Sequence, residues 1–158
     1  MAFEVFPKFI RSNYELHQWR HACAILAKDF PNELADLVAL SREFDTDVLW
    51  LGFCSVSDSF RFHHWRSSQE VRALAFGWSK EQGVWELVEG EPEPWEHSAF
   101  FLPRTLAIWS EEADEDEAKE MRRVWAAAEV RAGRVIPPID ARESARAVAE
   151  FYGLPGWS

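Results

Sequence analysis

Two histidines near the N-terminus have the spacing of a metal-binding pair. His17 and His21 lie four residues apart, and on a helix such residues project from one face. Imidazole pairs at this spacing supply two ligands to a divalent metal ion in helical metal sites. The motif lacks a third ligand, so a pair of ordinary surface or partly buried imidazoles is the alternative. We therefore assign no metal and no other cofactor, and keep His17 and His21 as a candidate pair.

A second group of chemically capable residues lies in the middle of the chain. His63 and His64 are neighbours on an expected strand, so they point to opposite faces and at most one can join a given site. A carboxylate beside a buried indole can have a raised pKa that suits acid catalysis. Five glutamates cluster around Trp85 and Trp95, namely Glu86, Glu89, Glu91, Glu93 and Glu96. The alternative is a solvated, rigid loop that contacts a partner.

The sequence carries none of the common enzyme signatures. It has no glycine-rich phosphate loop, no Gly-x-Ser-x-Gly and no His-Glu-x-x-His. No residue is therefore assigned a catalytic role, and the protein is expected not to be an enzyme.

Composition bounds the class of protein and of partner. The 158 residues, 47% hydrophobic and 28% charged, fit one folded domain over 1–158. The net charge of −10 opposes binding to nucleic acid, whose phosphates need Lys and Arg, and favours a basic protein partner. No long apolar run predicts a signal or membrane segment, so the expected location is the cytoplasm. Cys23 and Cys54 lie in apolar surroundings and are expected to be core thiols.

Two helices are expected before the sheet. Ser12 and Glu15 have the spacing of a capping box, and apolar residues then recur every three or four positions, which predicts a helix over 13–29. Pro31 suits the first turn of a second helix. Its apolar side carries Leu34, Leu37, Val38 and Leu40.

The middle of the chain predicts an antiparallel meander. Short runs rich in β-branched and aromatic residues, separated by turn residues, cover 48–56, 58–66, 70–78 and 84–90. The first run is apolar on both faces and should be central or covered, whereas the second alternates and should have one wet face. Residues 90–97 hold two prolines, which predicts a rigid loop leading to a short strand around Phe100 and Phe101.

Two helices are expected after the sheet, which makes the class α+β with a four- to five-stranded antiparallel sheet. One starts in the acidic run 110–117 and stops at Gly133, and the other is capped by Asp140 with Glu143. Gly153 and Pro155 end the last helix, and Trp157 is expected to dock on the body of the protein.

Two segments resemble known proteins. The sequences GVWELVEGEPEPWE and PPIDARESARAVAEFYGLPGW resemble a group of small uncharacterised bacterial proteins, which implies a bacterial source and no particular activity. The segment WRHACAILAKDFPNELADLVALSREF is similar to the N-terminal helical segment of some type II restriction endonucleases. That resemblance implies a helical packing module without a nuclease site.

These observations favour a non-enzymatic protein-interaction module, immunity-like or an adaptor, that uses an aromatic sheet face and acidic loops. One alternative is a small enzyme or ligand-binding protein that uses His and Glu residues near the sheet. Another is an acidic DNA mimic that inhibits a nucleic-acid enzyme. The residues expected to contact the partner are Trp78, Trp85, Glu91, Glu93, Trp95, Glu96, Glu111 and Glu112.

Overall fold

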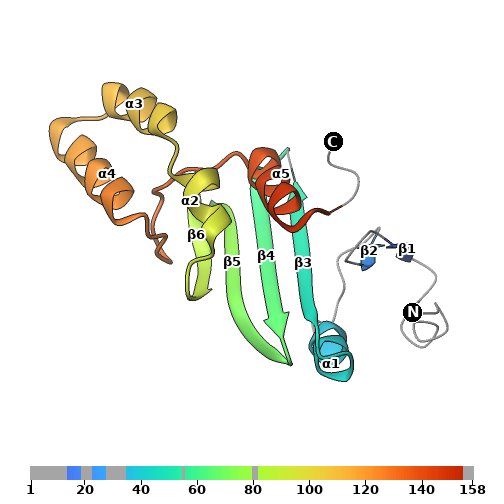
Figure 1. Ribbon diagram of the computed structural model, residues 1–158. Coiled ribbons are helices and arrows are strands. Elements are labelled where there is room, and N and C mark those ends of the chain that lie inside the picture. The colour runs from blue at the N-terminus through green and yellow to red at the C-terminus, as the bar shows by residue number, and fades with distance from the viewer. Residues whose placement is uncertain (1–13, 19–22, 28–34, 55, 80–81, 155–158) are drawn as a thin grey trace.

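A four-stranded antiparallel sheet forms the centre of the computed structural model, which describes residues 14–18, 23–27, 35–54, 56–79 and 82–154 (Figure 1). Its strands follow chain order, so the predicted α+β class and meander are confirmed. They are β3 (Asp47–Cys54), β4 (Ser59–Arg66), β5 (Gln69–Ser79) and β6 (Gln82–Gly90).

The turn between β4 and β5 explains why these strands pair side by side. Ser67 and Ser68 form a two-residue link with positive φ angles of 49° and 64°, the conformation that matches the twist of paired strands. The resulting register sets Phe62 opposite Leu74 and Phe60 opposite Phe76. Apolar side chains of adjacent strands are thereby brought to one face.

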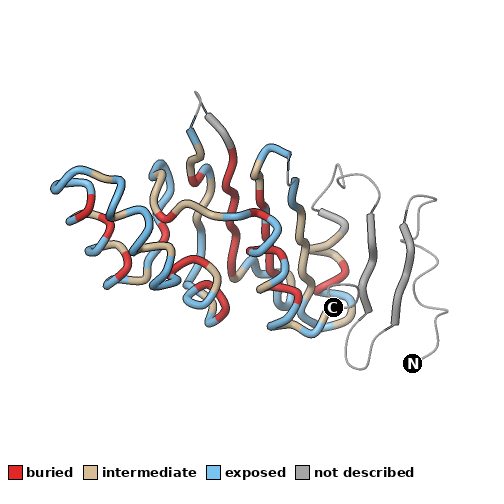
Figure 2. Tube along the Cα trace, turned by 90° about the horizontal axis from the view of Figure 1, so that it is seen from above, coloured by how far each residue is buried: buried red, intermediate tan, exposed pale blue. Residues whose placement is uncertain are grey.

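The core lies between that face and two helices, α2 (Pro94–Phe100) and α5 (Ala141–Tyr152) (Figure 2). Trp95 of α2 packs edge-on against Phe62, with ring centroids 5.1 Å apart. The buried residues of this core include Phe60, Phe62, Leu74, Phe76, Trp85, Trp95, Phe100 and Val148. The aromatic face of the meander is therefore covered by the protein's own helices.

The expectations about the faces of individual strands are met in part. β3 is an edge strand of the four-stranded sheet, and it is covered instead of central, because α1 (Ala35–Glu43) and α5 contact it. The second face of β4 is only partly wet, because His63 is 7% exposed and stacks on Trp65, which is 2% exposed.

Residues 94–100 form a helix where a loop and a short strand were expected. Pro94 occupies the first helical turn, where its missing N–H costs nothing. Glu93 and Glu96 form a capping box, in which Glu96 Oε1 accepts a hydrogen bond from the Glu93 N–H at 2.8 Å. The prolines therefore start a helix here.

The helix expected from 110 to 133 is two helices, α3 (Pro103–Glu112) and α4 (Glu115–Ala127). Asp114 separates them and caps α4, accepting from the Glu117 N–H at 2.9 Å. Ala128, with φ 49°, ends α4 before Gly133 is reached. Figure 1 shows α3 and α4 extending beyond β6, to one side of the sheet.

Of the two helices predicted before the sheet, the first is wrong for the described residues, and the second is found as α1. Residues 14–18 and 23–27 are strands β1 (Tyr14–Gln18) and β2 (Cys23–Ala27), paired antiparallel with Leu16 opposite Ile25. One helix, α1, precedes the central sheet and four helices follow it in the described part of the chain. Short apolar runs fit the period of a strand as well as that of a helix, so spacing alone does not distinguish the two here.

The last helix agrees with its prediction. Asp140 Oδ1 accepts from the N–H groups of Arg142 and Glu143, both at 2.9 Å, and Gly153 ends α5 with φ 64°. Pro155 and Trp157 lie outside the described residues.

Cys54 is exposed, contrary to the expected core thiol. Among the helices that the structure describes, none has the length and apolar character needed to cross a membrane.

Candidate functional site

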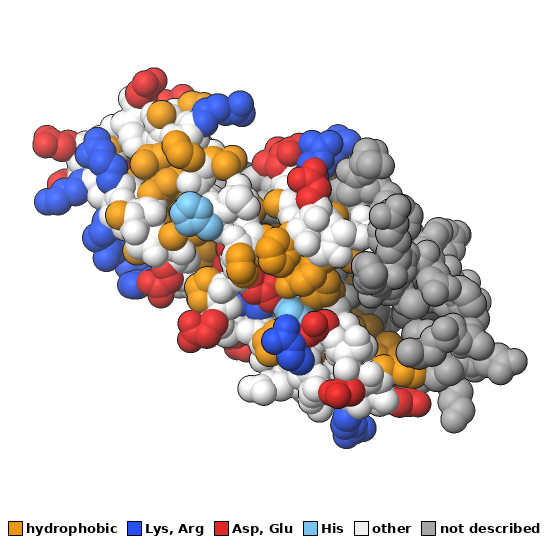
Figure 3. Space-filling model, in the orientation of Figure 1, with side chains coloured by type: hydrophobic (Ala, Val, Ile, Leu, Met, Phe, Trp, Pro, Cys, Tyr) orange, Lys and Arg blue, Asp and Glu red, His pale blue; other side chains and the backbone are white. Residues whose placement is uncertain are grey.

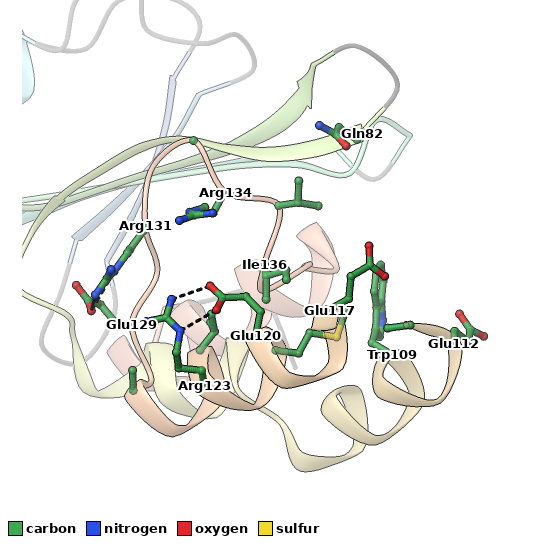
Figure 4. A pocket seen from close by; sticks show the side chains of 16 residues that line it. Gln82, Trp109, Glu112, Glu117, Glu120, Arg123, Glu129, Arg131, Arg134 and Ile136 are labelled. Carbon is green, nitrogen blue, oxygen red and sulfur yellow. Dashed lines mark hydrogen bonds and ion pairs between the residues drawn. The ribbon is translucent and has the colours of Figure 1, made fainter. Parts of the chain in front are cut away.

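A groove of about 540 Å³ lies between the α3–α4 hairpin and the chain that follows α4 (Figure 4). Its residues come from α3, α4, the first residue of β6 and the segment 129–136. It is lined by Gln82, Trp109, Glu112, Ala113, Glu117, Glu120, Met121, Arg123, Val124, Ala127, Glu129, Arg131, Gly133, Arg134, Val135 and Ile136.

One wall of the groove is held by a single buried tryptophan of the sheet. The backbone N–H of Trp85 donates to the Arg134 carbonyl at 2.9 Å, and the Trp85 carbonyl accepts from the Gly133 N–H at 2.8 Å. The indole Nε1 of Trp85 donates to the Pro137 carbonyl, also at 2.9 Å. These three bonds fasten the segment 133–137 along the free edge of β6.

The opposite wall is held by a second tryptophan. Trp125 of α4 donates from Nε1 to the carbonyl of Leu102, at the start of α3, at 3.1 Å. Its ring packs edge-on against buried Phe101, with centroids 5.7 Å apart. The helical hairpin is therefore anchored to the core at its base.

Helix α3 leaves apolar side chains exposed beside the groove. No residue of α3 is buried, and Trp109, which lines the groove, is 42% exposed. Leu102 and Ile108 are similarly exposed. Figure 3 shows hydrophobic side chains gathered on the surface of this helical hairpin. Uncovered apolar side chains beside a groove are typical of interaction sites.

Some charged side chains of the groove form ion pairs with one another, and others do not. Arg123 binds Glu120 through two hydrogen bonds of 2.7 Å, and Arg131 binds Glu129 at 2.7 Å. The hydrogen bond from Arg123 holds the pKa of Glu120 below its usual value, with Arg134 and Arg131 adding to the effect. Arg134, Glu112 and Glu117 make no ion pair with any described residue. These three charges are available to a partner.

A separate, partly buried polar cluster joins the sheet to the two covering helices. Glu93 Oε1 contacts His64 Nδ1 at 2.5 Å, and Glu93 Oε2 accepts from Trp95 Nε1 at 2.7 Å and from the Tyr152 hydroxyl. His64 Nε2 contacts Asp47 Oδ1 at 3.0 Å. Glu93 thereby links β4, α2 and α5.

The pKa values of this cluster shift in the directions that favour ion pairing. Burial by itself lowers the pKa of His64, but the hydrogen bonds and charges of Glu93 and Asp47 outweigh it and raise that pKa. Burial by itself raises the pKa of Glu93, but hydrogen bonds from His64, Tyr152 and Trp95 outweigh it and lower that pKa. Burial and the Glu93 carboxylate raise the pKa of Tyr152.

These contacts satisfy the polar atoms of the cluster within the protein. Both oxygens of Glu93 and both ring nitrogens of His64 already have partners within the protein. A general acid or base must present an atom to the substrate. In the part of the chain that the structure describes, no group of three His, Cys, Asp or Glu side chains is arranged to hold a metal ion.

Of the residues expected to contact a partner, some are buried in the core. Trp85, Trp95 and Glu96 are at most 2% exposed, so a direct contact with a partner does not fit them. Glu96 instead binds buried Arg72 through two hydrogen bonds of 2.6 and 2.7 Å. Glu93 belongs to the polar cluster described above.

The acidic candidates lie on the surface. Glu91, Glu111 and Glu112 are exposed, and Glu112 lines the groove. Trp78 lies on β5, and its side chain is outside the described residues. His17 lies on strand β1, which removes the helical spacing that motivated the metal pair, and His21 is outside the described residues.

The main groove residues were not among the candidates. Trp109, Val124 and Arg134 were absent, because a groove depends on how α3, α4 and the segment after them are placed. No local pattern distinguishes Trp109 from the buried tryptophans Trp85 and Trp95.

The comparisons with known proteins add no relative. The restriction endonucleases that an N-terminal segment resembles carry an Asp/Glu-x-Lys catalytic pattern on a strand. Residues Glu117-Ala118-Lys119 match that pattern in sequence, but they lie on helix α4. No protein family, no characterised protein and no solved structure matches the chain.

Proposed function

We propose that the protein is a non-enzymatic interaction module that binds a segment of a partner protein in the groove between α3, α4 and the segment 129–136. The observation that carries the proposal is the exposed Trp109 on a helix that buries none of its own residues, beside a groove of about 540 Å³. Exposed aromatic side chains in pockets are the usual anchors of protein interfaces.

The construction of the groove supports this function. Its two walls are fixed to the core through Trp85 and Trp125, so little ordering is needed when a ligand binds. A preformed site keeps the entropic cost of association low. The surface proposed from the sequence was the aromatic face of the sheet, and that face is covered by α2 and α5.

The two alternative functions have less support. An enzyme that uses the His and Glu residues near the sheet would need an atom of His64 or Glu93 that is not already bonded. A DNA mimic needs carboxylates spread along a face of the molecule. The unpaired acids that line the groove, Glu112 and Glu117, lie together at the turn between α3 and α4.

A peptide selection tests the proposed function. Random peptides displayed on phage are selected on the immobilised full-length protein, and the enriched peptides are measured against Trp109→Ala and Ile108→Ala. Both residues are exposed on α3, but only Trp109 lines the groove. We expect affinity to fall at least tenfold for Trp109→Ala, as for an interface anchor, and to stay unchanged for Ile108→Ala.

Enriched peptides that bind Trp109→Ala as well as they bind the unmodified protein would contradict the groove as the binding site. Failure to enrich any peptide would contradict the interaction function itself.

A further inference from the structure

The groove has opposite charges at its two ends. In Figure 4, Trp109, Glu112 and Glu117 are drawn toward one end of the groove, and Arg123, Arg131 and Arg134 toward the other. The acidic end continues into Glu111, Glu115 and Asp116, which are exposed. At the other end, two of the three arginines are paired to Glu120 and Glu129 within the groove, and Arg134 makes no ion pair with a described residue.

The acidic end has the chemistry to receive a cation. An exposed indole face attracts Lys and Arg through its quadrupole, and the attraction grows when carboxylates stand beside the ring. Trp109 is 42% exposed, and Glu112 and Glu117 line the same groove without an ion pair among the described residues. A guanidinium can stack on the indole while it donates to a carboxylate, which an apolar side chain cannot do.

The basic end has the chemistry to receive a carboxylate. Arg134 is exposed and lines the groove, and its backbone is fixed because its carbonyl accepts a hydrogen bond from the Trp85 N–H. A guanidinium held on a fixed backbone can bind a carboxylate through two parallel hydrogen bonds. Between the two ends, Met121, Val124 and Ile136 offer apolar surface.

We propose that the occupant of the groove is a partner segment with charges at both ends, which places a Lys or Arg side chain on Trp109 between Glu112 and Glu117, an apolar side chain on Val124, and a carboxylate on Arg134. This inference rests on the proposed function and names the chemistry of its ligand. The charge of −10 for the whole chain then steers the basic end of the partner toward the acidic end of the groove.

Double-mutant cycles with synthetic peptides test the arrangement. The parent probe is a fluorescein-labelled peptide with Lys residues at one end, Leu and Phe in the centre and Glu residues at the other. One derivative replaces its Lys residues by Gln, and another replaces its Glu residues by Gln. Each is titrated by fluorescence anisotropy against the full-length protein, Glu112→Gln/Glu117→Gln and Arg134→Gln.

We expect loss of the Lys residues to weaken binding to the unmodified protein about tenfold, within the range of a charge on an aromatic ring. The same loss should have no effect in Glu112→Gln/Glu117→Gln and its full effect in Arg134→Gln. Loss of the Glu residues should show the reverse pattern. Glu115→Gln/Asp116→Gln, which changes neighbouring exposed acids that do not line the groove, is the matched control and should keep both effects.

The outcomes separate this inference from the proposed function. Binding that is lost in Trp109→Ala but shows no coupling between the peptide charges and these residues would overturn the charge arrangement and leave the groove as the site. Binding of the Lys end that couples to Arg134 instead of the acids would also overturn it. No binding of the parent probe contradicts this inference, and the phage selection then decides separately whether the groove binds any peptide.

Discussion

The indole Nε1 of Trp85 donates a hydrogen bond to the carbonyl oxygen of Pro137 at 2.9 Å, across 52 residues of chain. Both residues are buried. The bond joins a core strand to the segment that forms one wall of the groove, so the most buried tryptophan of the sheet also positions a surface site. Core and site are therefore coupled through one side chain.

Replacement of Trp85 by Phe should affect stability and binding together. The change leaves the buried Pro137 carbonyl without its donor, and we expect a loss of about 2 kcal/mol in the free energy of unfolding, measured with urea. Peptides selected on the unmodified protein should bind more weakly, because the wall from 133 to 137 loses one of its three hydrogen bonds to residue 85. Trp109→Phe is the control and should keep the unfolding midpoint. Unchanged stability of Trp85→Phe would show that this hydrogen bond does not contribute to the free energy of unfolding.

The buried pair of Arg72 and Glu96 should be sensitive to loss of one partner. Their side chains are 2% and 3% exposed, and Arg72 also donates to the carbonyls of Glu89 and Gly90. Arg72→Met leaves a buried carboxylate unpaired, which should destabilise the fold by about 3–5 kcal/mol in urea unfolding. Arg146→Met removes an exposed pair with Glu143 and should leave the midpoint unchanged. Equal midpoints for the two variants would contradict the assigned role of the buried pair.

The cluster around Glu93 should give stability a maximum in mildly acidic solution. The folded pKa of His64 is raised above 6.5, so its contribution is complete below 6.5 and is lost as the pH rises through the folded value. The folded pKa of Glu93 is lowered below 4.5, so its contribution is complete above 4.5 and is lost as the pH falls through the folded value. Both contributions are complete between pH 4.5 and 6.5.

Urea unfolding at a series of pH values measures this dependence. We expect His64→Gln to remove the decline on the alkaline side of the maximum, and Glu93→Gln to weaken the decline on the acid side. Because each residue shifts the pKa of the other, each variant should also weaken the opposite limb, but only the limb of the removed group loses its titrating residue. A His64→Gln protein with the same pH profile as the unmodified protein would contradict the ion pair.

The protein should not bind duplex DNA at physiological salt. The net charge of −10 gives phosphates few cationic partners, and in the groove Arg123 and Arg131 are already paired to glutamates. A gel-retardation titration should show free DNA at every protein concentration. Salt-sensitive retardation would contradict this expectation, and the arginines of the groove would then be the candidate phosphate contacts.

Local patterns predicted the sheet and the last helix because their signals are short-range. The turn at Ser67 and Ser68 forces antiparallel neighbours, and Asp140 and Gly153 mark the two ends of α5. The same reasoning failed at Pro94, since a proline is compatible with a loop and with the first turn of a helix. It failed again at 14–18, where apolar spacing fits strand and helix.

The candidate site was harder to predict than the fold. Trp85 and Trp95 were predicted to contact a partner because they lie among glutamates. Trp85 is buried on the inner face of the sheet, and Trp95 is buried on α2. Trp109 looks no different from them in the sequence. It stays exposed because α3 packs against α4 and buries none of its own residues, a fact of tertiary arrangement that no local pattern contains.

Mapping a bound peptide by nuclear magnetic resonance tests the central claim most directly. The isotope-labelled full-length protein is titrated with the tightest peptide from the phage selection, and backbone amide shifts are followed. We predict the largest changes within the segments 109–113, 117–127 and 129–136, which contain most of the residues that line the groove. Changes concentrated on α5 or the central strands, with those residues unmoved, would contradict the account of the groove as the binding site.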